Sequence, residues 1–377
     1  MVSKNHENAI NSELMVDEWT EKYVDNVETG EIEHVKNYSG EVPIEKAKEY
    51  KYLGFIISCV GDNMANIKAI KDKSIGVIRT IMHKLEALNL ERYYFECAMI
   101  FMNVMLRGSI LYASETYYNL TENQLRSIER IEEGFLRKIL KTTKGCPIVQ
   151  LYLETGQWPA RFAIQKSRLL FLKTILAEDE QSMVSKFFYL QLQRPSRGDW
   201  ASTCLKDLKN LKILNTLEEI KIMPKRTFLN LLQKSIRENA LIYLLKKMGS
   251  KGSEMVYDSL EMADYLLPYN DRLKIEEKQT MFKIRNRMVE IGNNFGKKED
   301  CFCGVKETMS HIYTCEFLND EKSDNAYENI HTGNLSEQIE VFKRFEINIK
   351  RRNQIRLIRD EQNETPCDQS NDPLDCK

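Results

Sequence analysis

Four residues with soft metal-ligand side chains lie within fifteen residues near the C-terminal end of the chain: Cys301, Cys303, His311 and Cys315. Thiolate sulfur and imidazole nitrogen are ligands that zinc prefers, and a structural zinc site fills all four tetrahedral positions with protein ligands. The spacing C-x-C-x7-H-x3-C therefore predicts a Zn2+ site. The alternative is coincidence in a chain with nine cysteines, and the single residue between the first two is an unusually tight spacing.

A turn and a short helix are needed to bring these four side chains together. Gly304 follows the second cysteine and suits a tight turn. Residues 308–315 predict a short helix that places the histidine and the last cysteine on one face, because they are four residues apart. Phe302 and Tyr313 lie inside the cluster. These aromatic side chains either offer surfaces on which unpaired bases stack or pack a small core.

The rest of the chain has the composition of an ordinary globular protein. Its 377 residues, 42% hydrophobic and 29% charged, are enough for more than one structural unit. The first twenty residues are polar and acidic, unlike a secretory signal. The most apolar stretch, 93–113, contains Glu96, Asn103 and Arg107, which favours a buried core helix over a membrane span. Irregularly spaced cysteines favour a reducing compartment over a disulfide framework.

The net charge of −1 hides an uneven distribution. Residues 1–48 carry eleven acidic and five basic side chains, and residues 361–377 carry five and one. The 312 residues between them hold 49 basic and 40 acidic side chains. A positive excess of this size suits contact with phosphate, although it does not demand it.

Hydrophobic periodicity predicts a mainly α fold with a small N-terminal β element, a multi-helix body, a C-terminal zinc-knuckle-like module and a basic terminal helix. Residues 35–42 suit a hairpin, and the aromatic and β-branched run 50–58 predicts one strand. Thr121 and Gln124 have the spacing of a capping box. Helices are expected over residues 62–88, 91–118, 121–139, 147–154, 160–176, 201–214, 225–248, 254–266, 271–291 and 335–359.

These elements divide the chain into six expected regions. They are an acidic, partly disordered N-terminal region (1–48), a β element with the first helices (49–180), a helical linker region (181–298), the zinc module (299–318), a basic helix (319–360) and a disordered tail (361–377).

Five segments, in order, carry a resemblance to one protein family. They are Tyr50–Ser58 with Gly61-Asp62, Leu111–Thr116 with Leu120-Thr121, Arg130 and Glu132 with Phe135–Leu140, Pro147–Arg161, and the cysteine cluster preceded by Glu307-Thr308. Together they resemble the region that follows the palm in non-LTR (LINE-type) retrotransposon reverse transcriptases. The resemblance spans roughly residues 50 to 318. It implies that residues 49–180 are the end of the palm and a thumb-like region, that the cluster is a CCHC motif, and that the partners are RNA or DNA in the nucleus or cytoplasm.

The catalytic part of that family is missing from the sequence. A polymerase holds two metal ions about 3.5–4 Å apart with adjacent carboxylates, which the family supplies in a Tyr/Phe-x-Asp-Asp motif upstream of the first segment. This chain contains no Asp-Asp pair, and Asp17-Glu18 lies in a helical-looking run. The terminal Asp375-Cys376-Lys377 only faintly resembles a nuclease site and has no strand to hold it. We therefore expect neither polymerase nor endonuclease activity.

Three functions remain open. The chain is a nucleic-acid-binding C-terminal part of such a reverse transcriptase, or a truncated gene model of an active RNA-directed DNA polymerase, whose missing part is then a possible partner in trans. The third alternative is a domesticated helical interaction protein in which zinc only staples the fold.

Basic residues on three predicted helices are candidate phosphate contacts, although each set also fits a solvated helix face. The sets are Arg161, Lys166, Arg168 and Lys173; Lys283, Arg285 and Arg287; and, on the last helix, Lys343, Arg344, Lys350, Arg351, Arg352, Arg356 and Arg359. Because a palm would cover residues 60–118, we also expect an exposed apolar face there and poor solubility.

Overall fold

The computed structural model of the chain describes residues 35–36, 43–44, 49–52, 55–58, 63–91, 93–193, 198–249, 272–289, 291, 300–319, 327, 329–332 and 334–363. These residues are mainly helical, with small antiparallel β pairs near the N-terminus, as predicted. They belong to two compact units, residues 1–66 and 67–377. No helix in the described ranges has the length and apolar character to span a membrane.

The first unit contains two β pairs. Strands β1 (Val35–Lys36) and β2 (Pro43–Ile44) are antiparallel, so a β pair begins where the hairpin over 35–42 was predicted, but its second strand lies just beyond that range. Strands β3 (Glu49–Tyr52) and β4 (Phe55–Ser58) are also antiparallel. The prediction of one strand over residues 50–58 is therefore wrong. The two residues between β3 and β4 include Gly54, and a two-residue link containing glycine is typical of a hairpin.

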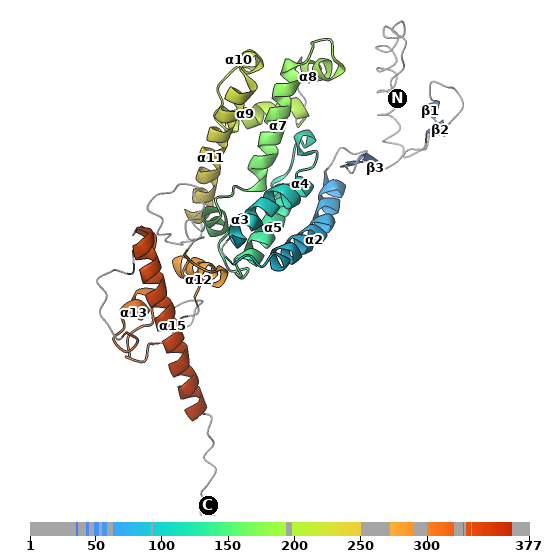
Figure 1. Cartoon of the computed structure of the whole chain (residues 1–377). Helices are drawn as coiled ribbons and strands as arrows, with labels where there is room; N and C mark the ends of the chain where they lie inside the picture. Colours follow the sequence, from blue (N-terminus) through green and yellow to red (C-terminus); the bar gives the residue numbers. More distant parts are fainter. Residues whose placement is uncertain are drawn as a thin grey trace, which may run out of the picture. The chain divides into compact units, whose positions relative to one another are not determined.

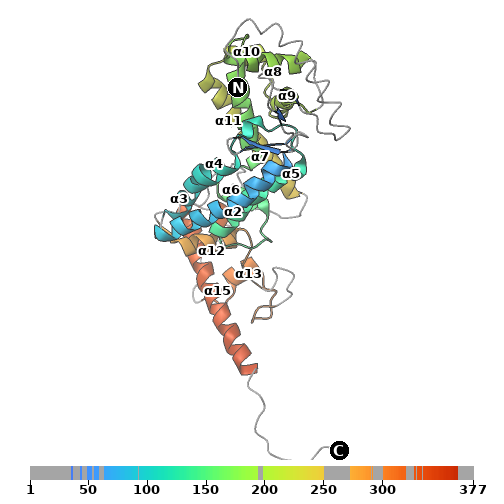
Figure 2. The ribbon, with the colours of Figure 1, turned by 90° about the vertical axis from the view of Figure 1, so that its right-hand side faces the viewer.

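The second unit is helical. The helices and helical turns are α2 (Met64–Ala87, beginning in the first unit), α3 (Tyr94–Phe101), η2 (Met102–Leu106), α4 (Arg107–Ile110), η3 (Ser114–Thr116), α5 (Glu122–Ile139), α6 (Ile148–Glu154), α7 (Ala160–Ala177), α8 (Met183–Gln193), α9 (Trp200–Asn210), α10 (Leu217–Ile222), α11 (Lys225–Gly249), α12 (Ile275–Arg285), α13 (Met309–Thr314), α14 (Asn329–Thr332) and α15 (Leu335–Asn363). Helix α7 contacts α5, α8, α9, α10 and α11, so it forms the centre of the helical body (Figure 1). Helix α13 lies against α15 in both ribbon views (Figures 1 and 2).

Most predicted helices are present, with three additions and one division. Helices α8, α10 and α14 were not predicted. The helix expected at 254–266 lies outside the described residues. The single helix expected over 91–118 is divided: α3 passes into a π turn, and the chain leaves helical geometry before Ala113, which has a left-handed φ of 54°.

The division places Arg107 directly after the π turn. Its buried guanidinium donates to Glu132 Oε1 (2.7 Å), Gln157 Oε1 (3.0 Å) and the Trp158 carbonyl (2.6 Å). These partners lie 25 to 51 residues away in sequence, so tertiary contacts override the continuous helical pattern here.

Helix α5 shows how sequence pattern and long-range pairing combine. Thr121 and Gln124 form the predicted capping box. Three glutamates of this helix, Glu129, Glu132 and Glu133, are almost fully buried. Each pairs with an arginine: Arg126 of the same helix pairs with Glu129 and Glu133, each at 2.8 Å, and Arg107 of α4 pairs with Glu132. Buried charges persist only when paired in this way, so this network holds α4, α5 and the chain before α7 together.

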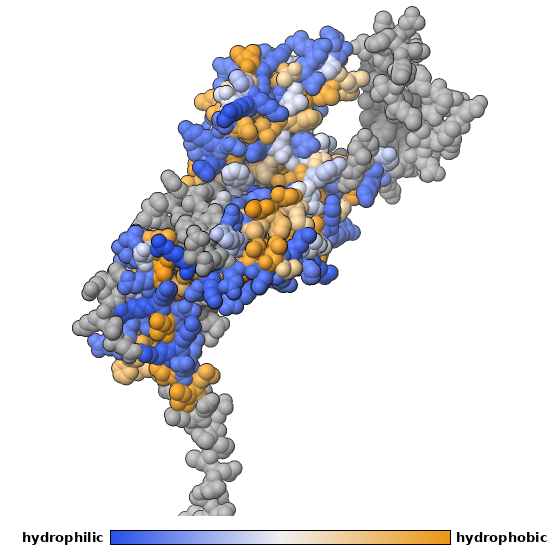
Figure 3. Space-filling model, viewed as in Figure 1, coloured by the Kyte–Doolittle hydropathy of each residue, from blue (hydrophilic) through white to orange (hydrophobic). Residues whose placement is uncertain are grey.

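The expected exposure of apolar side chains within residues 60–118 is observed. Figure 3 shows apolar residues gathered over the region of α3 and α4. Ile75, Leu88, Tyr93, Ile100 and Val104 are each about half exposed or more, with Val104 at 69%. The poor solubility expected from such a face stays a prediction.

A pair of glycine substitutions tests the backbone at two sites. Gly198 has a φ of +97°, and a Cβ there would lie 2.6 Å from Asn119 Nδ2, so Gly198→Ala is expected to destabilise the body by about 1–3 kcal/mol. Gly134 lies inside α5 with nothing within 4 Å of an added Cβ, so Gly134→Ala is expected to stabilise it by about 0.5–1 kcal/mol. Urea unfolding of both variants measures the two free energies. Equal effects would show that the left-handed backbone at Gly198 is not required.

Candidate metal centre

The first two cysteines of the cluster lie on a tight turn. A β-bridge between Asp300 and Lys306 closes it, and the Cys301 N–H donates to the Val305 carbonyl at 2.7 Å. The Gly304 N–H donates back to the Cys301 carbonyl at 2.8 Å, with Gly304 at a left-handed φ of 80°. Glycine adopts this conformation without steric cost. This compact turn explains how a single intervening residue can direct both sulfurs toward one point.

The other two members come from α13. Thr308, the first residue of the predicted helix, is its N-cap and accepts the His311 N–H at 3.1 Å. Cys315 follows the last residue of the helix. His311 and Cys315 therefore present their side chains one turn apart toward the cysteine turn.

The four ligand atoms all lie within 4.8 Å of one another. The Cys301 and Cys315 sulfurs are 3.7 Å apart, and the Cys315 and Cys303 sulfurs are 3.9 Å apart. A tetrahedral ion with metal–sulfur bonds of about 2.3 Å requires sulfur–sulfur distances of about 3.8 Å. The His311 Nε2 atom lies 3.1 Å from the Cys303 sulfur, so the imidazole needs to retreat by about 0.5 Å to complete the tetrahedron. The arrangement fits one four-coordinate metal ion.

The remaining free cysteines of the described chain do not share this arrangement. Among the residues that the structure describes, the cluster is the one group of three or more histidine, cysteine or acidic side chains able to hold a metal ion. Cys97, Cys146 and Cys204 are outside it. Their isolation counts against the alternative that the cluster is coincidental.

Two of the thiols have pKa values shifted by their surroundings. Burial raises the pKa of Cys301 to about 12. For Cys303, slight burial opposes ionisation, but hydrogen bonds from the Val305 backbone N–H and from neighbouring thiols lower its pKa overall. Metal binding requires the thiolate form, so a bound cation would have to displace the proton from the buried Cys301.

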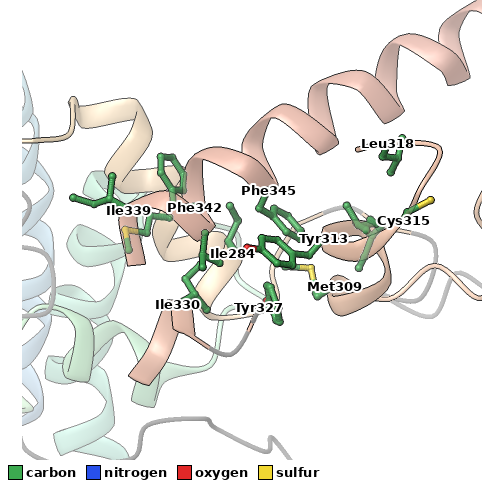
Figure 4. Packing of buried hydrophobic residues seen from close by; sticks show 14 of the residues in the cluster. Ile284, Met309, Tyr313, Cys315, Leu318, Tyr327, Ile330, Ile339, Phe342 and Phe345 are labelled. Carbon is green, nitrogen blue, oxygen red and sulfur yellow. The ribbon is translucent and has the colours of Figure 1, made fainter. Parts of the chain in front are cut away.

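One hydrophobic core holds the metal cluster and the last helix together. Buried side chains from α12, α13, α14 and α15 point toward one another around Tyr313 and Phe345 (Figure 4). Tyr313 is 2% exposed, and its ring centroid lies 6.0 Å from that of Tyr327. Of the two alternatives for Tyr313, packing of a core is therefore the one observed, whereas Phe302 is only partly buried. The expected regions 299–318 and 319–360 share this core with α12, and we call the whole assembly, α12 to α15, the C-terminal module.

Polar side chains of α15, and Asn319 in the segment after α13, donate hydrogen bonds to carbonyls at and after the end of α13. Asn348 Nδ2 donates to the Ile312 carbonyl at 2.9 Å, and Asn319 Nδ2 donates to the Cys315 carbonyl at 2.8 Å. Arg351 donates to the Leu318 carbonyl at 2.8 Å. Carbonyls at a helix C-terminus lack intrahelical partners, so the bonds from Asn348 and Arg351 fix α13 and its ligands against α15.

A buried ion pair provides a second connection. Glu307, fully buried just before α13, accepts two bonds from Arg352 (2.5 and 2.8 Å) and one from Arg356 (3.0 Å). In the sequence, Glu307 carries only part of the family resemblance, and no local pattern predicts this role. The signal was present only as an acidic residue 45 positions before its partner.

Several predicted phosphate contacts prove to be structural. Arg168, Lys173, Arg285 and Arg352 are at most 7% exposed. The first pairs with Asp207, the second donates to the Lys221 carbonyl at 2.7 Å, and the third pairs with Glu154 at 3.5 Å. A cation must reach solvent to neutralise a phosphate. These four hold the fold and do not face solvent, contrary to the prediction.

The other predicted contacts are more accessible. Arg161 lines a hollow of about 660 Å³, but Glu122 (2.7 Å) and Glu129 (2.5 Å) neutralise it. Lys350 is exposed and pairs with Glu346 along α15 at 3.1 Å. Lys166, Lys283 and Arg351 are partly exposed, Arg287 is exposed, and their contact with nucleic acid stays a prediction.

The exposed side chain beside the centre that sequence reasoning missed is Phe317, which is 67% exposed two residues after the last ligand. The carbonyl of the following residue, Leu318, accepts a 2.8 Å hydrogen bond from Arg351, which follows Lys350 in α15. The Arg351 guanidinium therefore lies against the backbone at Leu318, directly after Phe317. The chain matches no protein-family model, no curated protein and no solved structure.

Proposed function

We propose that the chain binds single-stranded RNA or DNA through a zinc-ordered C-terminal module, as the C-terminal part of a LINE-type reverse transcriptase without its polymerase site. The observation that supports this most is the tetrahedral arrangement of Cys301, Cys303, His311 and Cys315 beside exposed apolar side chains. Three thiolates and one imidazole are a donor set that favours zinc over the harder cations. The ion would orient the turn and α13; it would take no part in a reaction.

The surface next to the cluster has the chemistry that unpaired bases require. Phe317 and Val305 are 67% and 51% exposed, Phe302 is partly exposed, and Lys306 and Lys350 are exposed. Aromatic faces stack on bases of any sequence, and nearby cations attract the backbone. We therefore assign base stacking to Phe317, assisted by Phe302, in place of the buried Tyr313.

A stacking test separates this function from that of a structural zinc staple. Phe317→Ala is expected to weaken binding of a fluorescent, unstructured oligonucleotide about 10-fold, because loss of one stacked base costs about 1–3 kcal/mol. Fluorescence anisotropy measures the affinity for RNA and DNA versions, and elemental analysis measures zinc in the same samples. The matched control is Phe187→Ala on α8, where the phenylalanine is 55% exposed.

The outcomes distinguish the alternatives. One equivalent of zinc together with binding that only Phe317→Ala weakens supports the proposal. Bound zinc without oligonucleotide binding favours the third alternative, a helical interaction protein in which zinc only stabilises the fold. Binding that survives Phe317→Ala unchanged rules out the stacking surface.

A further inference from the structure

Two helix ends far apart in sequence meet in the described part of the chain. Helix α5 ends at Ile139, whose carbonyl accepts a 2.7 Å hydrogen bond from Gln279 in α12. Beyond the two helices, the Thr142 hydroxyl lies 3.6 Å from the sulfur of Met288. Each of the two segments turns there through a residue with left-handed backbone, Lys141 (φ 46°) in one and Arg287 (φ 53°) in the other. The turn after α5 and the turn after α12 therefore pack against each other.

Cations gather at this junction. Lys138, Lys141, Lys144 and Arg287 are exposed, and Lys283 is partly exposed; we call these five the α5–α12 lysine cluster. In the described ranges, none of the three lysines from the α5 end forms an ion pair with a carboxylate. The nearby carboxylates Glu133 and Glu154 are buried and paired with arginines. The cluster is consequently a surface of net positive charge.

Helix dipoles do not account for so many cations. Each helix C-terminus carries the equivalent of about half a negative charge, so the two ends together offset about one of the positive charges of Lys138, Lys141, Lys144 and Lys283. The rest of the charge of these four lysines has no carboxylate partner in the part of the chain that the structure describes. A single helix end with lysines is common, and α9 provides one: Lys206, Lys209 and Lys212 repeat the spacing of Lys138, Lys141 and Lys144, and Lys212 is also left-handed (φ 57°).

We propose that the α5–α12 lysine cluster binds the phosphodiester backbone of a nucleic acid. The inference rests on the proposed function and extends it, because α12 also contributes Met281 and Ile284 to the core of the C-terminal module. The strand whose bases stack at Phe317 would thus be held by its phosphates at the junction of α5 and α12, the helix that joins this junction to the core of the module. Exposed lysines act as point charges and bind phosphate without reading sequence, so binding here depends on salt and not on base identity.

Two matched triple variants test this surface. Lys138→Gln/Lys141→Gln/Lys144→Gln removes the α5 half of the cluster, and Lys206→Gln/Lys209→Gln/Lys212→Gln removes the same charge, at the same spacing, from the end of α9. Affinity for a fluorescent single-stranded oligonucleotide is measured by anisotropy at four salt concentrations, with thermal melting of each variant to confirm folding. The first triple is expected to lower the slope of log K against log salt by about 2–3 and to weaken binding at least 10-fold at low salt. The second is expected to change affinity less than 2-fold.

Each other result overturns the assignment in a recognisable way. Equal weakening by both triples would show a general charge effect with no defined surface. Binding that neither triple changes would remove this surface while the stacking site at Phe317 stands. Failure of the wild-type protein to bind any oligonucleotide would end both proposals. Displacement of the oligonucleotide by polyglutamate at equal charge concentration would identify an acidic protein as the occupant in place of nucleic acid.

Discussion

Removal of metal from the Cys301–Cys315 site is expected to unfold the C-terminal module while the helical body stays folded. Cys301 and Cys315 are 5% and 3% exposed. The turn at 300–306 and α13 meet at the four ligand atoms, which are the three cysteine sulfurs and His311 Nε2. Structural zinc contributes about 10–16 kcal/mol in small finger domains. Whole domains are stable by only about 5–15 kcal/mol, so a module of this size cannot absorb that loss.

Hydrogen exchange measures the expected result directly. In the presence of a chelator, or in Cys315→Ser, amides of α13 and the first half of α15 are expected to exchange at least 100-fold faster. Amides of α5 and α7 are expected to keep their protection, because their core and ion-pair network do not include the cluster.

Cys97→Ser is the matched control, because it replaces another described free cysteine, in α3, outside the cluster. It is expected to retain metal and to leave α13 protected. A purified protein without metal, or a module whose exchange is unchanged after the metal is removed, contradicts the assignment of the cluster as a structural metal site.

Features coded within a few residues could be predicted from the sequence. The capping box at Thr121, the short helix near residues 308–315 and the four candidate ligands all lie in short windows, and the structure shows each of them. Their geometry follows from helix periodicity and local hydrogen bonding, which one segment determines on its own.

Features that depend on distant partners could not be predicted. Arg168 and Arg352 are long side chains on polar-looking helix positions, and only their carboxylate partners, 39 and 45 residues away, decide that they are buried. An arginine on a helix gives the same sequence signal whether it faces solvent or a buried carboxylate. The same limit explains why α3 to α4 was expected to be one helix, since the contacts of Arg107 come from α5 and from residues 157–158.

The loss of the Glu307 carboxylate is expected to separate α15 from the metal cluster. Glu307 is fully buried, and Arg352, its bidentate partner, is 4% exposed. Glu307→Ala leaves the Arg352 guanidinium buried without this partner, which typically costs about 3–5 kcal/mol. Chemical denaturation of the metal-loaded protein measures this free energy, and hydrogen exchange of α15 locates it.

A double replacement distinguishes the pair from general disruption. Glu307→Leu with Arg352→Met removes both charges and keeps apolar volume, so it is expected to recover most of the lost stability, because buried pairs are often replaceable by packed side chains. The side chain of Arg356 is 29% exposed, so it reaches solvent once its partner is gone.

Glu346→Gln is the surface control: its partner Lys350 is 70% exposed, so the change is expected to cost less than about 1 kcal/mol. Similar losses for Glu307→Ala and Glu346→Gln would mean that the buried pair does not carry the connection, and that the polar contacts of Asn348 and Arg351 suffice to hold α15 on the metal cluster.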